Sequence, residues 1–364
     1  MPQRRPFQHF PWHLAVVVLA ISAVGIWNLA SASRSAHAPV WISQTAWMGV
    51  GIVVALGVTL VDHRAFQRIS WVFYALVLLM LVAVLVKGRY VMGARRWLTF
   101  GPVNFQPSEL AKLAVALALA NWLSGDAEKR RDGYGLFGLV VPMLITVVPA
   151  ALILKQPDLG TALVVLCVGG TQILFAKVRW KTLALLAGVG IVGVFLVYPH
   201  LKPYQKKRVE TFLDPQADAL GAGYHATQSM IAVGSGQGFG KGWGQGTQTY
   251  LSFLPEQHTD FIFSVWAEEH GFVGCLLLLG LYFALVTSAV DIVGGARDRF
   301  GSFLAVGVTA MLFWHVVINI GMVIGLLPVV GVTLPLMSYG GSSVIAIYAG
   351  IGLLANVGMR RFVN

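Results

Sequence analysis

Charged residues are scarce in this chain of 364 residues. Asp, Glu, Lys and Arg together make up 11% of it, whereas soluble domains carry about 25%. So few charges cannot cover a water-facing surface, which excludes a soluble globular protein. The 57% of hydrophobic residues also excludes a disordered chain, whose composition is the reverse.

Cysteine is nearly absent too. The sequence has two, Cys167 and Cys275, and both lie inside long apolar runs without metal-ligand spacing around them. The sequence therefore predicts neither a disulfide framework nor a zinc site.

Long apolar runs, in contrast, are abundant. A transmembrane helix needs about 20 mostly apolar residues. The first run follows Arg4 and Arg5, as in a cleaved secretory signal, but its length and the many similar runs favour a membrane span. No repeat or linker divides the chain, so we predict one integral membrane domain, residues 1–364, that is all-α. About ten transmembrane helices are expected, near 12–30, 41–61, 69–86, 107–123, 136–154, 159–176, 183–198, 261–290, 303–326 and 344–358.

An even number of spans places both termini on one side of the membrane. The short loops on that side each carry two or three positive residues, for example Arg64 and Arg68, or Arg297 and Arg299. Such loops stay in the cytoplasm. The sequence therefore predicts cytoplasmic termini and one long extracytoplasmic loop at about 199–260.

The net charge is +11, from 26 Lys and Arg against 15 Asp and Glu. In a soluble protein this would suggest nucleic acid, but topology accounts for most of it here, and we predict no nucleic-acid partner. The unexplained positive residues cluster in two outer loops, 87–106 and 199–260. Long loops translocate whatever their charge, which fits the second loop better than the first. The alternative is that both loops face a polyanionic ligand.

Polar residues also mark the outer ends of two spans. Glu109 and Lys112 lie three residues apart at the start of the fourth span, close enough to pair. They are either a self-neutralising ion pair or the lining of a polar cavity that directs Lys112 toward a phosphate. Gln156 and Asp158 lie in a tight outer turn, where Asp158 is suited to cap the next helix.

The two outer loops differ in composition. In 87–106, Arg95 and Arg96 stand beside Trp97 and other aromatics, which is typical of an amphipathic element at the membrane interface. The alternative is that these residues bind a lipid pyrophosphate, because arginine contacts phosphate oxygens in pairs. The glycine-rich stretch 221–246 predicts a pliable segment, either an anion-binding nest around Lys241 or a flexible lid.

The most informative pattern is FLPEQHTDFIFSVWAEEHG, residues 253–271. Pro255 is expected to start a helix. One face of it would carry a polar residue at every fourth position, namely Glu256, Asp260, Ser264 and Glu268. Carboxylates this close raise the pKa of at least one of them and make a usable base, with His258 as a proton or phosphate partner. The alternative is that acidic residues simply favour a helix N-terminus.

Seven motifs follow one another along nearly the whole chain. They are GARRW (93–97), FQPSELAK (105–112), QPDLGT (156–161), FLDP (212–215), GAGYHATQS (221–229), FLPEQHTDFIF (253–263) and PLMSYGGSS (335–343). In this order they resemble the SEDS family of bacterial cell-wall polymerases. The stretch GKGWGQGTQ (240–248) is more like the elongation members of that family than the division members.

The resemblance implies a peptidoglycan glycosyltransferase of cell-wall elongation in the bacterial inner membrane. Such an enzyme polymerises lipid II on the extracytoplasmic side and releases undecaprenyl pyrophosphate. The essential aspartate of the family maps onto Asp260, with general base as its expected role. The other candidate substrate-binding residues are Arg95, Arg96, Trp97, Glu109, Lys112, Gln156, Asp158, Arg208, Lys241, Glu256, His258 and Ser343.

The resemblance also implies a divalent cation, Mg²⁺ or Mn²⁺, whose ligands the sequence does not identify. The implied partners are lipid II, the undecaprenyl-linked glycan, a class B penicillin-binding protein that acts as transpeptidase, and the MreC and MreD proteins. Two other functions stay open: a transporter that flips lipid-linked precursors across the membrane, and a polymerase of the division branch.

Overall fold

The computed structural model describes residues 9–34, 39–91, 94–101, 103–126, 132–197, 199, 206, 210–214, 222–251, 253–254 and 256–361. Helices overlap all ten predicted spans. They are α1 (Trp12–Ala32), α2 (Val40–Leu60), α3 (His63–Lys87), α4 (Pro107–Asp126), α5 (Val140–Lys155), α6 (Leu159–Phe175), α7 (Trp180–Val197), α11 (Ile262–Gly294), α12 (Arg299–Val323) and α13 (Gly341–Met359). The helices α9 (Ala222–Ser235) and α10 (Thr247–Tyr250) lie in the long loop, and a 3-10 turn, η1 (Leu136–Leu139), leads into α5.

Seven of these segments are long and apolar enough to cross a membrane, within the described residues. They are α1, α2, α3, η1 with α5, α11, α12 and α13. The helix α6 is apolar but has only 17 residues. A multi-pass membrane protein is therefore supported, while the count of ten spans stays a prediction.

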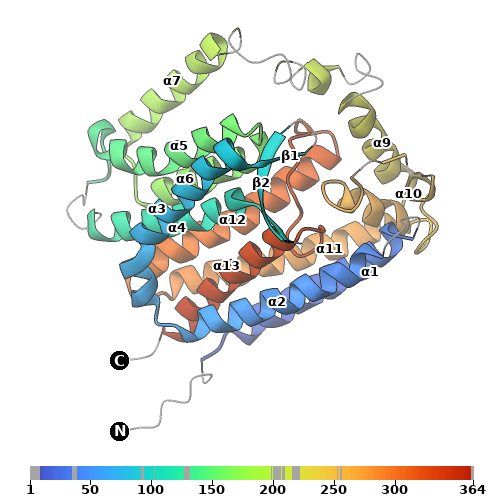
Figure 1. Cartoon of the computed structure of the whole chain (residues 1–364), viewed down its shortest axis with the longest axis horizontal. Helices are drawn as coiled ribbons and strands as arrows, with labels where there is room; N and C mark the ends of the chain where they lie inside the picture. Colours follow the sequence, from blue (N-terminus) through green and yellow to red (C-terminus); the bar gives the residue numbers. More distant parts are fainter. Residues whose placement is uncertain are drawn as a thin grey trace.

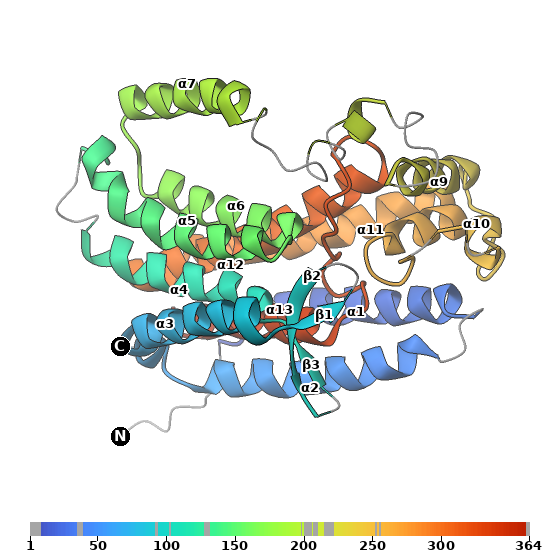
Figure 2. The ribbon, with the colours of Figure 1, turned by 45° about the horizontal axis from the view of Figure 1, so that its top comes forward.

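A small sheet departs from the all-α prediction. The strands β1 (Arg89–Val91), β2 (Ala94–Phe100) and β3 (Val103–Phe105) form an antiparallel sheet in that order. Gly101, with φ of 59°, allows the tight turn between β2 and β3. The sheet lies against the ends of α3 and α4 (Figure 2). The predicted amphipathic element is thus a sheet, because its short, aromatic-rich stretches suit strands.

The helices α4 and α12 form the buried centre of the bundle (Figure 1). Small residues allow this close packing: a Cβ atom on Gly307 of α12 would lie 2.8 Å from the Cβ of Ala116 on α4. The outer helices α2 and α3 expose apolar side chains such as Val53 and Leu79. The helix α7 stands apart from the other helices (Figures 1 and 2).

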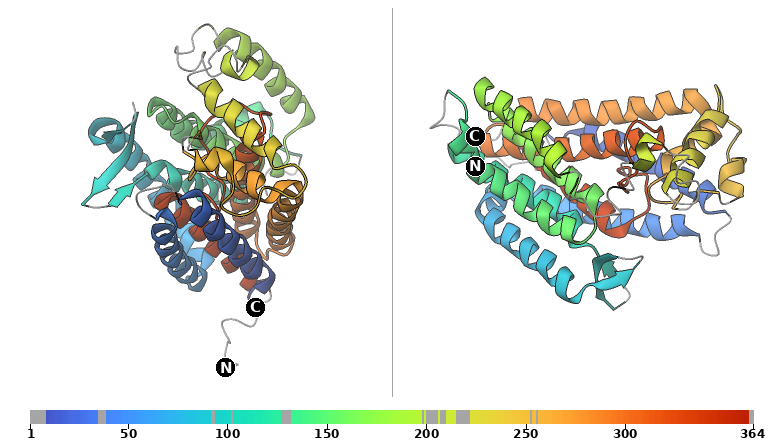
Figure 3. Two further views of the ribbon diagram at one scale, coloured as in Figure 1. Left: turned by 90° about the vertical axis from the view of Figure 1, so that its right-hand side faces the viewer. Right: turned by 90° about the horizontal axis from the view of Figure 1, so that it is seen from above.

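The two described ends of the chain lie at the same end of the bundle (Figure 3). Arg360 Nη1 lies 3.4 Å from Asp62 Oδ1, and His63 Nε2 lies 2.6 Å from Asp298 Oδ2. The turns predicted to share a side with the termini therefore do meet there.

The connection after α9 is fastened to a kink in α11. Gly271, with φ of 62° and ψ of −162°, breaks the helix. The freed N–H groups of Phe272 and Val273 donate to carbonyls of residues 237 and 238, at 2.8 and 3.0 Å. In return, the N–H groups of Lys241 and Gly242 donate to the carbonyls of residues 268 and 269, both at 3.0 Å. These two N–H groups are bonded to carbonyls, which argues against the anion nest around Lys241, one of the two alternatives for this stretch.

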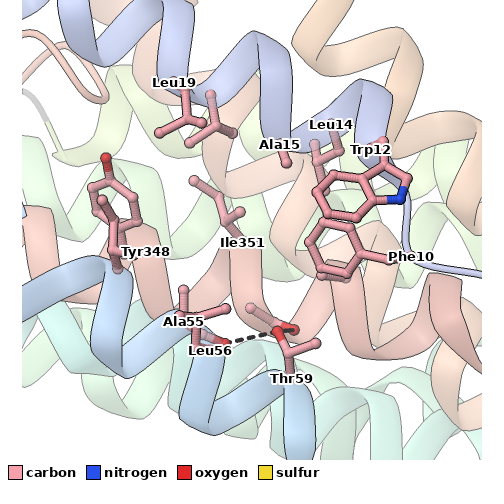
Figure 4. Close-up of a pocket in the computed structure, with 14 residues that line it drawn as sticks. Phe10, Trp12, Leu14, Ala15, Leu19, Ala55, Leu56, Thr59, Tyr348 and Ile351 are labelled. Carbon is pink, nitrogen blue, oxygen red and sulfur yellow. Dashed lines mark hydrogen bonds between the residues drawn. The ribbon is translucent and has the colours of Figure 1, made fainter. Parts of the chain in front are cut away.

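An apolar cavity of about 240 Å³ lies between α1, α2 and α13 (Figure 4). The Thr59 hydroxyl in its wall donates to the Ala55 carbonyl at 2.7 Å. The Tyr348 hydroxyl bonds that of Ser22 at 2.8 Å. These wall hydroxyls are satisfied within the protein, so this cavity offers no evident chemistry.

Candidate active site

A polar cavity of about 520 Å³ gathers residues from most of the sequence motifs. Its walls are the sheet, the start of α4, the turn between α5 and α6, residues 256–260, α12 and residues 330–343. The predicted site residues that line it are Arg96, Trp97, Glu109, Asp158, Glu256, Asp260 and Ser343. Segments far apart in sequence thus converge on one site.

Asp260 lies in the turn just before α11, and neighbours hold its backbone in place. The Asn319 side chain of α12 donates to the Asp260 carbonyl at 2.9 Å and also to the Val332 carbonyl at 2.6 Å. A Cβ atom on Gly331 would come within 3.1 Å of Asp260 Oδ2, and Gly331 has φ of 74°. Glycine at 331 therefore leaves room for the carboxylate.

The environment of Asp260 favours its neutral form. Burial, with a smaller contribution from the negative charges of Glu256 and Asp158, raises the pKa of Asp260 to about 6. The nearby positive charge of Arg96 acts in the opposite direction. A carboxylate with this pKa is ionised at neutral pH and still basic enough to accept a proton.

Arg96 reaches from β2 to the turn between α5 and α6. Its Nε donates to the Gln156 carbonyl at 3.4 Å, and its Nη2 donates to the Pro157 carbonyl. Within the described residues its hydrogen-bond partners are both neutral carbonyls, so its positive charge stays available to an anion in the cavity.

Asp158 joins the starts of two helices at the cavity wall. It caps α6 by accepting from the Thr161 N–H at 3.2 Å and from the Thr161 hydroxyl at 3.0 Å. Gln106, just before α4, donates to the same carboxylate at 3.0 Å. The capping role predicted for Asp158 is confirmed, and the cap faces the cavity.

Lys112 lies beneath the cavity floor. Its side chain is 1% exposed, and its ammonium lies 2.8 Å from Glu109 Oε2 and 2.9 Å from His315 Nε2. His315 Nδ1 lies 3.0 Å from the Thr333 carbonyl. Because a carbonyl only accepts, Nδ1 carries the proton and Nε2 accepts from Lys112. The predicted Glu109–Lys112 pair exists, but Lys112 faces these partners and not the cavity.

His315 and Asn319 did not figure among the sequence candidates. Both lie within the predicted span 303–326, where polar side chains are costly and typically functional. The high cost of a polar side chain within a membrane span was therefore enough to identify His315 as a candidate site residue.

Besides Lys112, four predicted residues in the described part of the chain do not line the cavity. Arg95 is exposed on β2, and Gln156 is buried with its amide donating to the Leu81 carbonyl at 2.9 Å. The His258 carbonyl accepts from the Tyr339 N–H at 2.8 Å, and burial lowers the pKa of the His258 side chain. Lys241 pairs with Glu268 at 2.6 Å. Arg208 lies outside the described residues.

The predicted stripe of carboxylates is wrong. The helix α11 begins at Ile262, and Glu256 has φ of 56°, which no helix interior adopts. Pro255 lies outside the described residues. The Ser264 hydroxyl bonds that of Ser229 at 2.8 Å, and Glu268 pairs with Lys241 away from Asp260. Glu256 and Asp260 meet because a turn, not a helix face, brings them together.

The described residues contain no cluster of three His, Cys, Asp or Glu side chains that could hold a metal ion. Of the cavity carboxylates, Asp158 is already engaged by Gln106 and Thr161, whereas Glu256 is exposed. The residues present thus supply no complete cation site. Mg²⁺ is often held by one or two carboxylates together with substrate phosphates.

Comparisons with known proteins agree with the motifs. The family described as cell cycle protein FtsW/RodA/SpoVE matches residues 7–362. The peptidoglycan glycosyltransferase MrdB of Escherichia coli is 40% identical over 353 residues, which cover 96% of this chain and 92% of that protein. Proteins named FtsW are among the further relatives.

Two solved structures share the fold. A chain from a peptidoglycan synthase complex, titled for its coordination of polymerization and crosslinking, has a TM-score of 0.85 and 36% identity. The similarity covers 98% of this chain and 100% of that one. The rod shape determining protein RodA of Thermus thermophilus has a TM-score of 0.74 and 33% identity, covering 98% and 99%.

Proposed function

The chain belongs to the FtsW/RodA/SpoVE family and is a peptidoglycan glycosyltransferase, and we infer that it polymerises lipid II with Asp260 as general base. The observation that carries this inference is the burial of one carboxylate, with a pKa of about 6, in a polar cavity that Arg96 also lines. A base and an anion-binding group in one cavity are what glycosyl transfer from a pyrophosphate requires.

The proposed step is a single inverting displacement. The acceptor sugar hydroxyl gives its proton to the Asp260 carboxylate as its oxygen bonds to the anomeric carbon of the donor. The bond from that carbon to the pyrophosphate oxygen breaks, and undecaprenyl pyrophosphate leaves with the bonding electrons. Arg96 stabilises the charge that develops on the leaving group.

Few of the positive residues predicted to bind the pyrophosphate are in a position to contact it. Among the positive residues predicted to bind it, Arg96 lines the cavity, whereas Lys112 is buried beneath it and Lys241 is paired with Glu268. Arg96 is therefore the primary contact in this proposal. Glu256, an exposed carboxylate of the cavity, would hold the expected Mg²⁺ or Mn²⁺, which would help to neutralise the pyrophosphate charge. The proposed displacement includes no step through it.

We propose that the cavity opens on the extracytoplasmic side of the bacterial inner membrane. The end of the bundle that holds both described ends of the chain also holds Arg64, Arg68, Arg299 and Arg360, which the positive-inside rule assigns to the cytoplasm. Elongation partners, a class B penicillin-binding protein with MreC and MreD, belong to the same proposal. The similarity to a chain of a synthase complex supports the first of them.

Polymerisation of lipid II by the purified chain, followed on gels, tests the function. The Asp260→Asn variant should lose at least about 100-fold in rate, while Asp291→Asn, at an exposed aspartate of α11, should match wild type. The wild-type rate should rise as the pH increases through about 6, because only the ionised carboxylate accepts a proton. Full activity of Asp260→Asn would disprove the base assignment.

Two further outcomes separate the alternatives. Glycan strands formed in detergent, where there is no membrane to cross, support a polymerase, whereas lipid II translocation in vesicles without any strands would support a transporter. Restoration of rod shape in cells that lack their elongation polymerase supports the elongation branch. Rescue of division instead would assign the chain to the FtsW branch.

A further inference from the structure

A second polar cavity, of about 400 Å³, lies at the other end of the bundle, where α3 and α12 begin and α4 ends. Arg299, in its wall, precedes His315 of the Asp260 cavity by sixteen residues of α12, roughly 24 Å along the helix axis. We propose that this cavity binds the phosphate of an anionic membrane phospholipid. It is lined by Arg64, Gln67, Arg68, Ser124, Gly125, Asp298, Arg299 and Phe300.

Three arginines face this cavity without a carboxylate partner. Within the described residues, Arg64, Arg68 and Arg299 form no ion pair. The cavity's carboxylate, Asp298, is already used: its Oδ2 lies 2.6 Å from His63 Nε2, and its Oδ1 accepts from the Gly301 N–H at 2.6 Å. The three arginines and Asp298 together therefore leave an excess of two positive charges in the cavity wall.

A bound phosphate would relieve this repulsion. Guanidinium groups contact phosphate oxygens in pairs, which makes arginine the preferred residue for such sites. The first turn of α12 also lies in the wall, and the positive end of its dipole favours an anion there. A basic cavity between helix ends at the membrane surface is where anionic headgroups bind.

The face of α3 below the arginines favours a lipid over a free phosphate. Val72, Leu76 and Leu79 follow Arg68 at intervals of four, four and three residues, so all four share one face of the helix. Their side chains are exposed, Leu79 by 70%. This apolar stripe extends roughly 16 Å from Arg68 toward the middle of the membrane. A phospholipid whose phosphate meets the arginines would lay an acyl chain along it.

Native mass spectrometry of the purified full chain, without lipid II, tests the proposal separately from polymerase activity. The probes are phosphatidylglycerol and the zwitterionic phosphatidylcholine. Each arginine near an anionic group contributes roughly fivefold in affinity. The triple variant Arg64→Gln, Arg68→Gln, Arg299→Gln should therefore bind phosphatidylglycerol roughly 100-fold more weakly, with little change for phosphatidylcholine.

A matched variant controls for total charge. Lys177→Gln, Arg179→Gln, Lys181→Gln removes three positive charges from the connection between α6 and α7 and the first turn of α7, and should bind phosphatidylglycerol like wild type. Equal weakening in both triple variants, or none in the first, would overturn the proposal. So would displacement of the lipid by inorganic phosphate at equal concentration. If the first triple variant does not fold, Arg68→Gln alone should weaken binding roughly fivefold, and wild-type affinity in this variant would overturn the proposal.

Discussion

At the scale of single residues, the raised basicity of the Asp260 carboxylate lowers the stability of the fold at neutral pH. Burial raises its pKa from 3.8 to about 6, so the folded chain favours the neutral acid. The stabilisation that this carboxyl contributes is complete below pH about 4 and is lost as the pH rises through about 6. At neutral pH the fold therefore carries the cost of an ionised, partly buried group.

Removing this charge should stabilise the protein. We expect Asp260→Asn to raise the free energy of unfolding at pH 8 by up to about 3 kcal/mol, because a pKa difference of about two units corresponds to that amount. Thermal unfolding in detergent without divalent cations measures it. The gain should shrink as the pH falls toward 5, and Asp291→Asn should show no such gain. A variant less stable than wild type at pH 8 would contradict the stated origin of the pKa.

His315 supports the cavity floor through two hydrogen bonds. Its Nε2 accepts from Lys112 and its Nδ1 donates to the Thr333 carbonyl. His315→Leu removes both and should lower the free energy of unfolding by about 3 kcal/mol, since it leaves a buried ammonium with one acceptor fewer. His315→Gln offers one acceptor and one donor and should lose less than half of that. Chemical unfolding of both variants measures the difference, and equal losses would argue against these roles.

At the scale of secondary structure, the kink of α11 depends on one glycine. A Cβ atom on Gly271 would lie 2.3 Å from the Gly240 nitrogen and 2.8 Å from the Gly236 oxygen. These are backbone atoms, which cannot move aside as a flexible side chain can. The kink therefore requires glycine both for its φ and for its close contacts.

We expect Gly271→Ala to lower the free energy of unfolding by about 3 kcal/mol, from backbone strain together with overlap. Gly280→Ala lies in the same helix, where an added Cβ meets nothing within 4 Å, and should be neutral or slightly stabilising. Thermal unfolding compares the two. Similar melting temperatures for both variants would contradict the described kink.

The helices could be predicted from hydropathy because long apolar runs have one stable form in a membrane. The cavity could be predicted only through motif resemblance. No local spacing indicates that Arg96, Asp158 and Asp260 meet, since their contacts arise from the packing of distant segments.

Predictions from residue spacing were wrong where the chain does not form a helix, or where a residue pairs with a partner far away in the sequence. The four-residue spacing of Glu256 and Asp260 belongs to a non-helical segment. From the sequence, Lys241 was predicted to be a free cation, because its partner, Glu268, follows 27 residues later. The short strands of 89–105 lack the length that makes alternation visible.

At the scale of the whole molecule, the two ends of the bundle should face opposite compartments. Leu213 in the long loop is 76% exposed, and Lys181 in the first turn of α7 is exposed. In a chain with Cys167→Ser and Cys275→Ser, an impermeant maleimide should label Leu213→Cys in intact spheroplasts. Lys181→Cys should react only after lysis. The reverse labelling would overturn the proposed orientation.

The cavity has a consequence for the synthesis of the chain. Residues 330–343 form one wall of it, and Asn319 holds residues 260 and 332 together. A ribosome that has translated Asp260 must still add some 80 residues before this wall exists. The nascent chain therefore holds the proposed catalytic carboxylate without a complete cavity until residue 343 has been added. A chain cut short by premature termination would occupy the membrane without consuming cell-wall precursor.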